Sequence, residues 1–334
     1  MASKIRSYTS IAIKVLVAAA LIVFMVRGGQ LDLSKLWALM TFRNVTIAIS
    51  LSVIINLFAA WRWIVLLRAR GFYIPYIYGL NLYLIGLFFS YALPGSVSGD
   101  LVRGYYLVQD YPGKKMDSIL SVLIDRVLGL YTFFWLTLIA VAYDFNLVSS
   151  HPEIRWIALL CFLTFVGMTL FFLLSFSARL FKYSGLHFLV TKIEPLHRVM
   201  EGFQRFGRDR KIIGVSLMAS ILAQMGTMLF FYLIAQATGD FDITWRAILF
   251  AVPMGFVVTA IPISPAGVGV GQVAFLYLFQ TYVGHPTSFG ATAITAFQLG
   301  SAVVALFGAV LYLKRRKPHE IANIKSNMES AATT

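Results

Sequence analysis

The sequence predicts an all-α polytopic membrane protein, and three observations predict it. Hydrophobic residues fill 59% of the 334 positions and charged residues only 13%, a balance that a soluble fold of this size cannot bury. Apolar windows close to the roughly 20 residues that a helix needs to cross a bilayer recur along the chain. Two further apolar segments, one in each half of the sequence, are broken by proline and glycine.

Six apolar windows predict full membrane spans. They cover residues 11–26, 45–67, 119–143, 157–176, 212–237 and 288–313. The first window follows basic residues as a signal peptide does, but no small-x-small cleavage site follows it, so we expect a retained span. The windows define a single membrane domain over residues 1–317, followed by a polar tail, 318–334, that we expect to be disordered.

The two broken segments, residues 76–108 and 245–283, each predict an apolar helix, a break and a second, shorter helix. Non-helical backbone at membrane depth persists only where protein or a wet cavity satisfies its peptide groups. Broken helices in both halves of a chain are therefore a pointer to a binding site. We expect each segment to form a re-entrant hairpin, on the basis of loop charge.

Positive charge in the loops sets the expected orientation. The basic segments 177–211 and 314–317, and Arg68 and Lys114 beside the first broken segment, are expected in the cytoplasm. Within the first of these, helical spacing of apolar residues over 196–206 predicts an amphipathic helix in the inner interface. The first hairpin then enters from the cytoplasm, the second from outside, and both termini are cytoplasmic. One expected outer loop departs from the rule because it holds Arg27, Lys35 and Arg43.

The same scheme predicts an inverted repeat, with residues 45–143 and 212–313 running in opposite directions across the membrane. The hydropathy pattern supports the repeat better than identity does. Pro94 can be set against Pro265 and Val97 against Val268, but setting Asp100 against Gln272 needs a one-residue gap.

Each break would leave free backbone N–H groups at the start of the helix that follows it. Such a start attracts anions through its unpaired donors and its dipole. We expect the two starts to hold a phosphate between them; the alternative is a pair of kinked helices whose glycines allow tight packing. The candidate residues in the breaks are Pro94, Gly95, Ser96, Ser98, Gly99, Asp100, Pro265, Gly267, Gly269, Gly271 and Gln272.

Charged side chains at membrane depth are costly and usually face an interior cavity. Asp100 and Arg103 are spaced to pair on one helix, whereas the adjacent Asp125 and Arg126 need partners elsewhere. We expect interhelical pairs among these four, with an arginine released when an anion binds; a purely structural charge network is the alternative. Arg62 either faces the same cavity or extends to the interface between its neighbouring tryptophans.

Among uncharged polar residues inside the apolar helices, only Asn81, on the helix that precedes the first break, joins the candidate site. Helix-to-helix hydrogen bonds account for Asn56, Gln224 and Gln298.

No motif indicates an enzyme or a metal centre. The single cysteine, Cys161, cannot form a disulfide framework, and the histidines lack ligand spacing. There is no G-x-S-x-G motif and no P-loop. The net charge of +14 gathers in loops and at the ends, where anionic lipid headgroups lie, so we expect the membrane surface and not nucleic acid as partner. We expect no enzymatic activity, no cofactor and no metal.

Three stretches, NLYLIGLFFSYALPGSVSGDLVRGYYL, LIDRVLGL and PISPAGVGVGQVAFLYLF, resemble the membrane region of the lysylphosphatidylglycerol synthase family, also called flippase-like domain proteins. The resemblance covers about residues 11–313. It implies an integral inner-membrane protein that binds, and can translocate, an anionic lipid or a polyprenyl-phosphate-type intermediate. The sequence lacks the soluble lysyl-transferring domain, so synthase activity is not implied. Gln272 stands where an acidic residue is expected, so proton coupling there is not implied either.

Together these observations predict a flippase-type transporter. A lipid phosphate would enter laterally, lie between the two helix starts and be countered by Arg103 or Arg126, while the inverted halves rock around it. Two alternatives stay open: a secondary transporter of a small anionic solute, and a non-transporting membrane subunit or scaffold for a lipid-modifying enzyme. The oligomeric state is also open, a homo-oligomer included.

Overall fold

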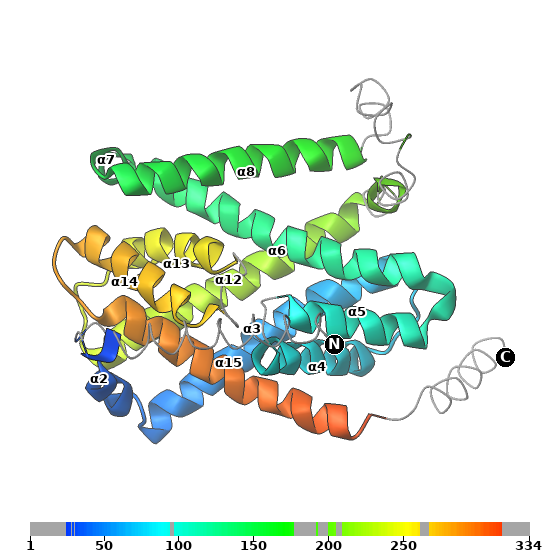
Figure 1. The fold of residues 1–334 in the computed structure, drawn as a ribbon, viewed down its shortest axis with the longest axis horizontal. Coiled ribbons are helices and arrows are strands. Elements are labelled where there is room, and N and C mark those ends of the chain that lie inside the picture. The colour runs from blue at the N-terminus through cyan, green and yellow to red at the C-terminus, as the bar shows by residue number, and fades with distance from the viewer. Residues whose placement is uncertain are drawn as a thin grey trace, which may run out of the picture.

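The computed structural model describes residues 25–27, 29, 31–93, 97–176, 192, 200–204, 209–260 and 267–315, and the regular elements in them are all helices (Figure 1). Five are long and apolar enough to cross a membrane: α3 (Phe42–Ala69), α6 (Lys115–Tyr143, after the 3-10 turn η1, Pro112–Lys114), α8 (Pro152–Phe176), α12 (Arg210–Thr238) and α15 (Phe289–Leu313). The shorter helices are α2 (Leu33–Ala38), α4 (Tyr76–Ala92), α5 (Ser98–Asp110), α7 (Phe145–Ser150), α13 (Trp245–Thr259) and α14 (Val270–Val283).

The five long helices coincide with five of the six predicted spans. The remaining predicted features fall mostly or wholly outside the described residues. These are the first span, the amphipathic loop helix, the polar tail, and the break residues Pro94, Gly95, Ser96 and Pro265.

The first broken segment folds as a hairpin of α4 and α5. At its base, the Tyr78 hydroxyl, in the first turn of α4, donates to the carboxylate of Asp110, the last residue of α5. Near its tip, a Cβ atom built on Gly99 would lie 2.0 Å from the carbonyl oxygen of Gly86, so the two helices touch backbone to backbone. Ser98 Oγ donates to the Phe89 carbonyl at 3.0 Å and so satisfies one of the last carbonyls of α4.

The second broken segment forms a matching hairpin of α13 and α14. Its base is held by His285 Nε2, 2.9 Å from Asp242 Oδ2, and by the rings of Phe250 and Tyr282, whose centroids are 5.4 Å apart. Its interior is aromatic: Phe231 of α12 stacks on Phe275 of α14, with centroids 5.1 Å apart. Figure 1 shows α13 and α14 at the left of the molecule and α4 and α5 at the right.

The packing pattern of eight helices repeats. We match α3 with α12, α4 with α13, α5 with α14 and α6 with α15. Whenever two of these helices pack together, their two counterparts also pack together. The matched pairings are α3–α4 with α12–α13, α4–α5 with α13–α14, α5–α6 with α14–α15, α3–α6 with α12–α15, α4–α15 with α13–α6, and α3–α15 with α12–α6. The remaining pair, α3–α12, is its own counterpart. The two halves are therefore structural repeats.

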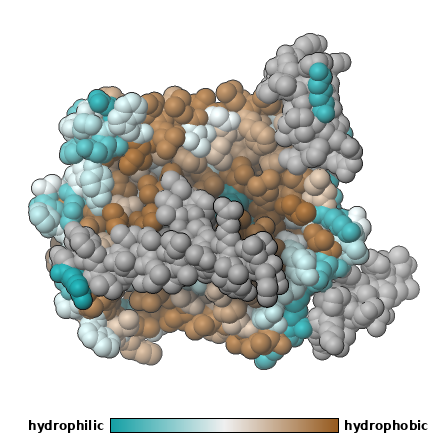
Figure 2. Space-filling view, in the orientation of Figure 1, coloured by the Kyte–Doolittle hydropathy of each residue, from teal (hydrophilic) through white to brown (hydrophobic). Residues whose placement is uncertain are grey.

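The central helices α3 and α12 run antiparallel. Arg62, near the end of α3, contacts Ser220 in the first half of α12, whereas Asn44, at the start of α3, lines a pocket with Gln236 near the end of α12. The repeats are thus inverted relative to each other. In the same orientation, Figure 2 shows hydrophobic surface across the middle of the molecule and hydrophilic residues at its left and right ends, as a bilayer would require.

The close contact at the hairpin tip gives a stability prediction. Gly99→Ala places a methyl group against the backbone oxygen of Gly86, which cannot move aside. We therefore expect the free energy of unfolding to fall by about 1–3 kcal/mol. Gly104→Ala, on the same helix, is the control, because its Cβ would lie 3.7 Å from Val122, an ordinary contact. Thermal unfolding in detergent measures both variants. Equal stability of the two would contradict this description of the tip.

Candidate functional site

A cavity of about 350 Å³ opens between α3, α4, α5, α6 and α12, with single side chains from α13 and α15. Its polar and charged lining comes from five helices. These residues are Arg62, Tyr83, Ser90, Asp100, Arg103, Asp125, Arg126, Ser220, Gln224 and Thr227. Asp125 and Ser220 each lie ten residues after the start of their helix, about 15 Å along it. A bilayer core is about 30 Å thick, so this distance along the helix is about half of that thickness.

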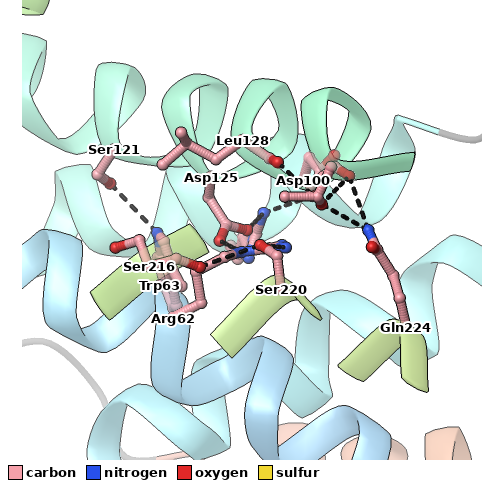
Figure 3. Close-up of polar contacts among 12 residues, drawn as sticks. Arg62, Trp63, Asp100, Ser121, Asp125, Leu128, Ser216, Ser220 and Gln224 are labelled. Atoms are coloured by element: carbon pink, nitrogen blue, oxygen red, sulfur yellow. Dashed lines mark hydrogen bonds and ion pairs between the residues drawn. The ribbon is translucent and has the colours of Figure 1, made fainter. Parts of the chain in front are cut away.

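Asp125 is the centre of the polar network, shown in Figure 3. Its side chain is 2% exposed and accepts from two arginines on different helices. Arg62 Nε, from α3, donates to Oδ1 at 2.6 Å, and Arg103 Nη2, from α5, donates to Oδ2 at 2.8 Å. A buried carboxylate is tolerated when charged partners and hydrogen bonds compensate its lost hydration, and here both oxygens are compensated.

Asp100 extends the network toward the surface. Arg103 Nη2 lies 2.8 Å from Asp100 Oδ1, and Arg126 Nη1 donates to Asp100 Oδ2. The side chains of Asp100 and Arg126 are 21% and 27% exposed, against 5% for Arg103. The ion pairs therefore run from Arg62 through Asp125, Arg103 and Asp100 to Arg126. Three arginines and two aspartates leave a formal charge of +1 around the cavity.

The guanidinium group of Arg103 is fixed by its neighbours, but some of its N–H donors are not used. Its guanidinium carbon lies 4.8 Å from the ring centroid of Trp63 and 5.5 Å from that of Tyr83, so it packs against two aromatic faces. Trp63 is fixed in turn by its indole N–H, which donates to Ser121 Oγ at 3.3 Å. Within the part of the chain that the structure describes, Nε and Nη1 of Arg103 have no hydrogen-bond partner. Buried N–H groups of a cation at a cavity wall are suited to receive an anion.

Helix α12 supplies the opposite wall. Ser220 Oγ accepts from Arg62 Nη1 at 2.9 Å, and Gln224 Nε2 donates to Thr132 Oγ1 at 2.5 Å and to the Gly129 carbonyl at 3.1 Å. A Cβ on Gly129 would lie 2.9 Å from Arg62 Nη1, so this glycine leaves the room in which the guanidinium lies against α6. Arg62 therefore faces the cavity and does not extend to the interface.

Four of the sequence-predicted residues, Asp100, Arg103, Asp125 and Arg126, thus meet around one cavity. The sequence reasoning did not place Ser220 or Gln224 at the site. A signal for them exists, because polar residues recur along one face of the apolar helix α12: they are Ser216, Ser220, Gln224 and Thr227. Asn81 lies on α4 but does not line this cavity, and Ser98 and Gly99 serve the hairpin contacts described above.

Among the described residues, Gly267, Gly269, Gly271 and Gln272 do not line this cavity. Gln272 instead caps its own helix: its Oε1 accepts from Gly269 N at 2.7 Å, and Gly269 adopts a positive φ of 85° that suits glycine. Its Nε2 donates to Gln298 Oε1 of α15 at 2.8 Å.

This amide pair is the counterpart of the charged pair in the first repeat. Gln272 and Gln298 lie 172 residues after Asp100 and Arg126, on the matching helices α14 and α15. An ion pair between Asp100 and Arg126 joins α5 to α6, and a neutral hydrogen bond between Gln272 and Gln298 joins α14 to α15. Only the first repeat is charged at this position.

No group of three His, Cys, Asp or Glu side chains within the described ranges could hold a metal ion.

The network gives a second stability prediction. Asp125→Asn removes the charge that compensates Arg62 and Arg103. We therefore expect the free energy of unfolding to fall by about 3–5 kcal/mol, as when one partner of a buried ion pair is removed. Asp117→Asn, on the same helix, breaks a more exposed pair with Arg70 and should cost at most about 1 kcal/mol. Thermal unfolding in detergent compares the two variants. If Asp125→Asn were the milder change, Asp125 would not be the centre of the network.

Comparison with known proteins places the chain in a family. The family model described as the lysylphosphatidylglycerol synthase TM region matches residues 11–309. Curated proteins gave no match. Solved structures gave no match either. The matched region contains α3 to α14, nearly all of α15 and every residue of the charged cavity. The chain is therefore a multi-pass membrane protein that belongs to the lysylphosphatidylglycerol synthase transmembrane-region family.

Proposed function

We propose that the protein is a flippase-type transporter, without enzymatic activity of its own, that binds the phosphate of an anionic lipid in the charged cavity and moves the lipid between leaflets. The observation that carries this proposal is the excess of one arginine over the aspartates in the described lining, together with Nε and Nη1 of the buried Arg103, which have no hydrogen-bond partner among the described residues. A phosphodiester brings one negative charge and so balances the cavity. A zwitterionic lipid brings no net charge and leaves the excess in place.

Membership in this family supports a lipid as the substrate, because the family description names a phospholipid synthase. The inverted repeats support transport, because two similar halves on either side of a site can exchange which side of the membrane they expose. In this mechanism the phosphate competes with Asp100 and Asp125 for the arginines. The ion pairs that hold α3, α5 and α6 together would then rearrange as the lipid binds.

A lipid-scrambling assay tests the proposal. Proteoliposomes receive fluorescent phosphatidylglycerol or phosphatidylcholine, and a membrane-impermeant quencher reports the lipid that reaches the outer leaflet. We expect wild type to move phosphatidylglycerol faster than phosphatidylcholine, and Arg103→Gln to slow the anionic lipid at least tenfold, which corresponds to about 1.4 kcal/mol.

Arg70→Gln is the matched control, because Arg70 pairs with Asp117 away from the cavity. It should transport at the wild-type rate. Equal rates for wild type and Arg103→Gln, or no transport of any anionic lipid by well-folded wild type, would refute the flippase proposal. Transport of inorganic phosphate without lipid movement would favour the small-solute alternative.

We also propose that the protein lies in an inner membrane and that the α4–α5 hairpin enters this membrane from the cytoplasmic side. The basic residues at the base of the hairpin support this orientation: Arg68, Arg70, Lys114 and Lys115. Cysteine labelling tests this orientation after Cys161, which is 1% exposed, is replaced by alanine. We expect Lys114→Cys to react with an impermeant maleimide from the cytoplasmic side and His285→Cys from the outside. Labelling of both positions from the same side would contradict the orientation.

A further inference from the structure

A second cavity, of about 470 Å³, lies between α5 and α6, the neighbouring helices at the right of Figure 1. Apart from two residues its walls are apolar or aromatic. They are formed by Val97, Leu101, Gly104, Tyr105, Val108, Ile119, Val122 and Leu123, and we call this cavity the α5–α6 groove. The two charged residues in its lining are Asp100 and Arg126, which also line the charged cavity. The same ion pair thus belongs to both spaces.

The groove opens outward. Leu101, Ile119 and Leu123 are 68%, 56% and 43% exposed. Gly104 leaves space at the bottom of the groove because it has no side chain. A Cβ atom at this position would occupy that space and lie 3.7 Å from Val122. Exposed leucines alone would indicate only contact with bulk lipid. The groove differs because its apolar walls end at a cation that can pair with a phosphate.

We propose that the α5–α6 groove holds one hydrocarbon chain of the lipid whose phosphate enters the charged cavity, and that the Asp100–Arg126 pair is the gate between the two. This inference rests on the proposed function and names the route of the substrate. The occupant is an acyl chain because one lipid must present hydrocarbon and phosphate together, and the groove and the cavity offer apolar walls and arginines on either side of one ion pair.

The exposure of the ion pairs fixes the order of events. Arg126 is the most exposed of the three arginines, with 27% of its side chain accessible, whereas Arg62 and Arg103 show 12% and 5%. A phosphate that enters the charged cavity past the Asp100–Arg126 end of the groove therefore meets Arg126 first. Asp100 keeps its pair with Arg103 when Arg126 turns to the phosphate, so the gate opens without leaving the carboxylate alone.

Photocrosslinking tests the groove. Wild-type protein in phosphatidylcholine nanodiscs receives phosphatidylglycerol that carries a diazirine on one acyl chain, and mass spectrometry maps the labelled residues. We expect α5 and α6 to be labelled at the groove, and excess unlabelled phosphatidylglycerol to remove most of that label. Leu160 and Leu163 of α8, which are 61% and 58% exposed, report bulk lipid, and their label should not be competed away.

Two variants sharpen the result. Leu123→Trp fills the groove from an exposed position and should lower the competed label at least tenfold and slow phosphatidylglycerol movement, whereas Leu163→Trp, on α8, should change neither. Arg126→Gln should lower the competed label of phosphatidylglycerol to the level found with diazirine-labelled phosphatidylcholine.

Two outcomes would overturn the inference. One is groove labelling that resembles that of α8 and resists competition; the other is normal transport and labelling in Leu123→Trp. If either occurs while Arg103→Gln still slows transport at least tenfold, the groove assignment fails and the proposed function stands. If Arg103→Gln also transports normally, the proposed function itself fails.

Discussion

The rest of the site depends on one constraint: Asp125 is buried at membrane depth and must be compensated by arginines from two other helices. Arg62 and Arg103 meet this need from α3 and α5, so the pairs also tie the hairpin to the long helices. One carboxylate cannot neutralise two guanidinium groups, and Asp100 is shared with Arg126. The described side chains around the cavity therefore sum to a formal charge of +1, in surroundings where charge is costly.

The scaffold is symmetric but its chemistry is not. The helix pairings of one repeat recur in the other, while the ion pair between Asp100 and Arg126 has a neutral counterpart in Gln272 and Gln298. The aromatic packing of Phe231 on Phe275 fills the second hairpin. The described part of the first hairpin is thus charged and lines the cavity, whereas in the second hairpin Gln272 caps α14. In the proposed mechanism, the two similar halves move about a shared axis and the charged half binds the anion.

Much of this could be predicted from the sequence, because hydropathy reveals membrane helices and proline-glycine breaks reveal where they end. The five long helices and the two hairpins follow from such patterns, and the pairing among Asp100, Arg103, Asp125 and Arg126 follows from the cost of charge at membrane depth. The direction of Arg62 could not be predicted, since it depends on the space that Gly129 leaves on another helix. Nor could the capping by Gln272, because a glycine-rich helix start looks the same whether its donors are free or used.

The central claim is that the cavity selects one negative charge on a lipid. Native mass spectrometry of delipidated wild-type protein, offered equal amounts of phosphatidylglycerol and phosphatidylcholine, tests this claim most directly. The account predicts that the first lipid retained by each chain is the anionic one, with at least a tenfold preference, or about 1.4 kcal/mol. Equal retention of the two lipids would contradict it.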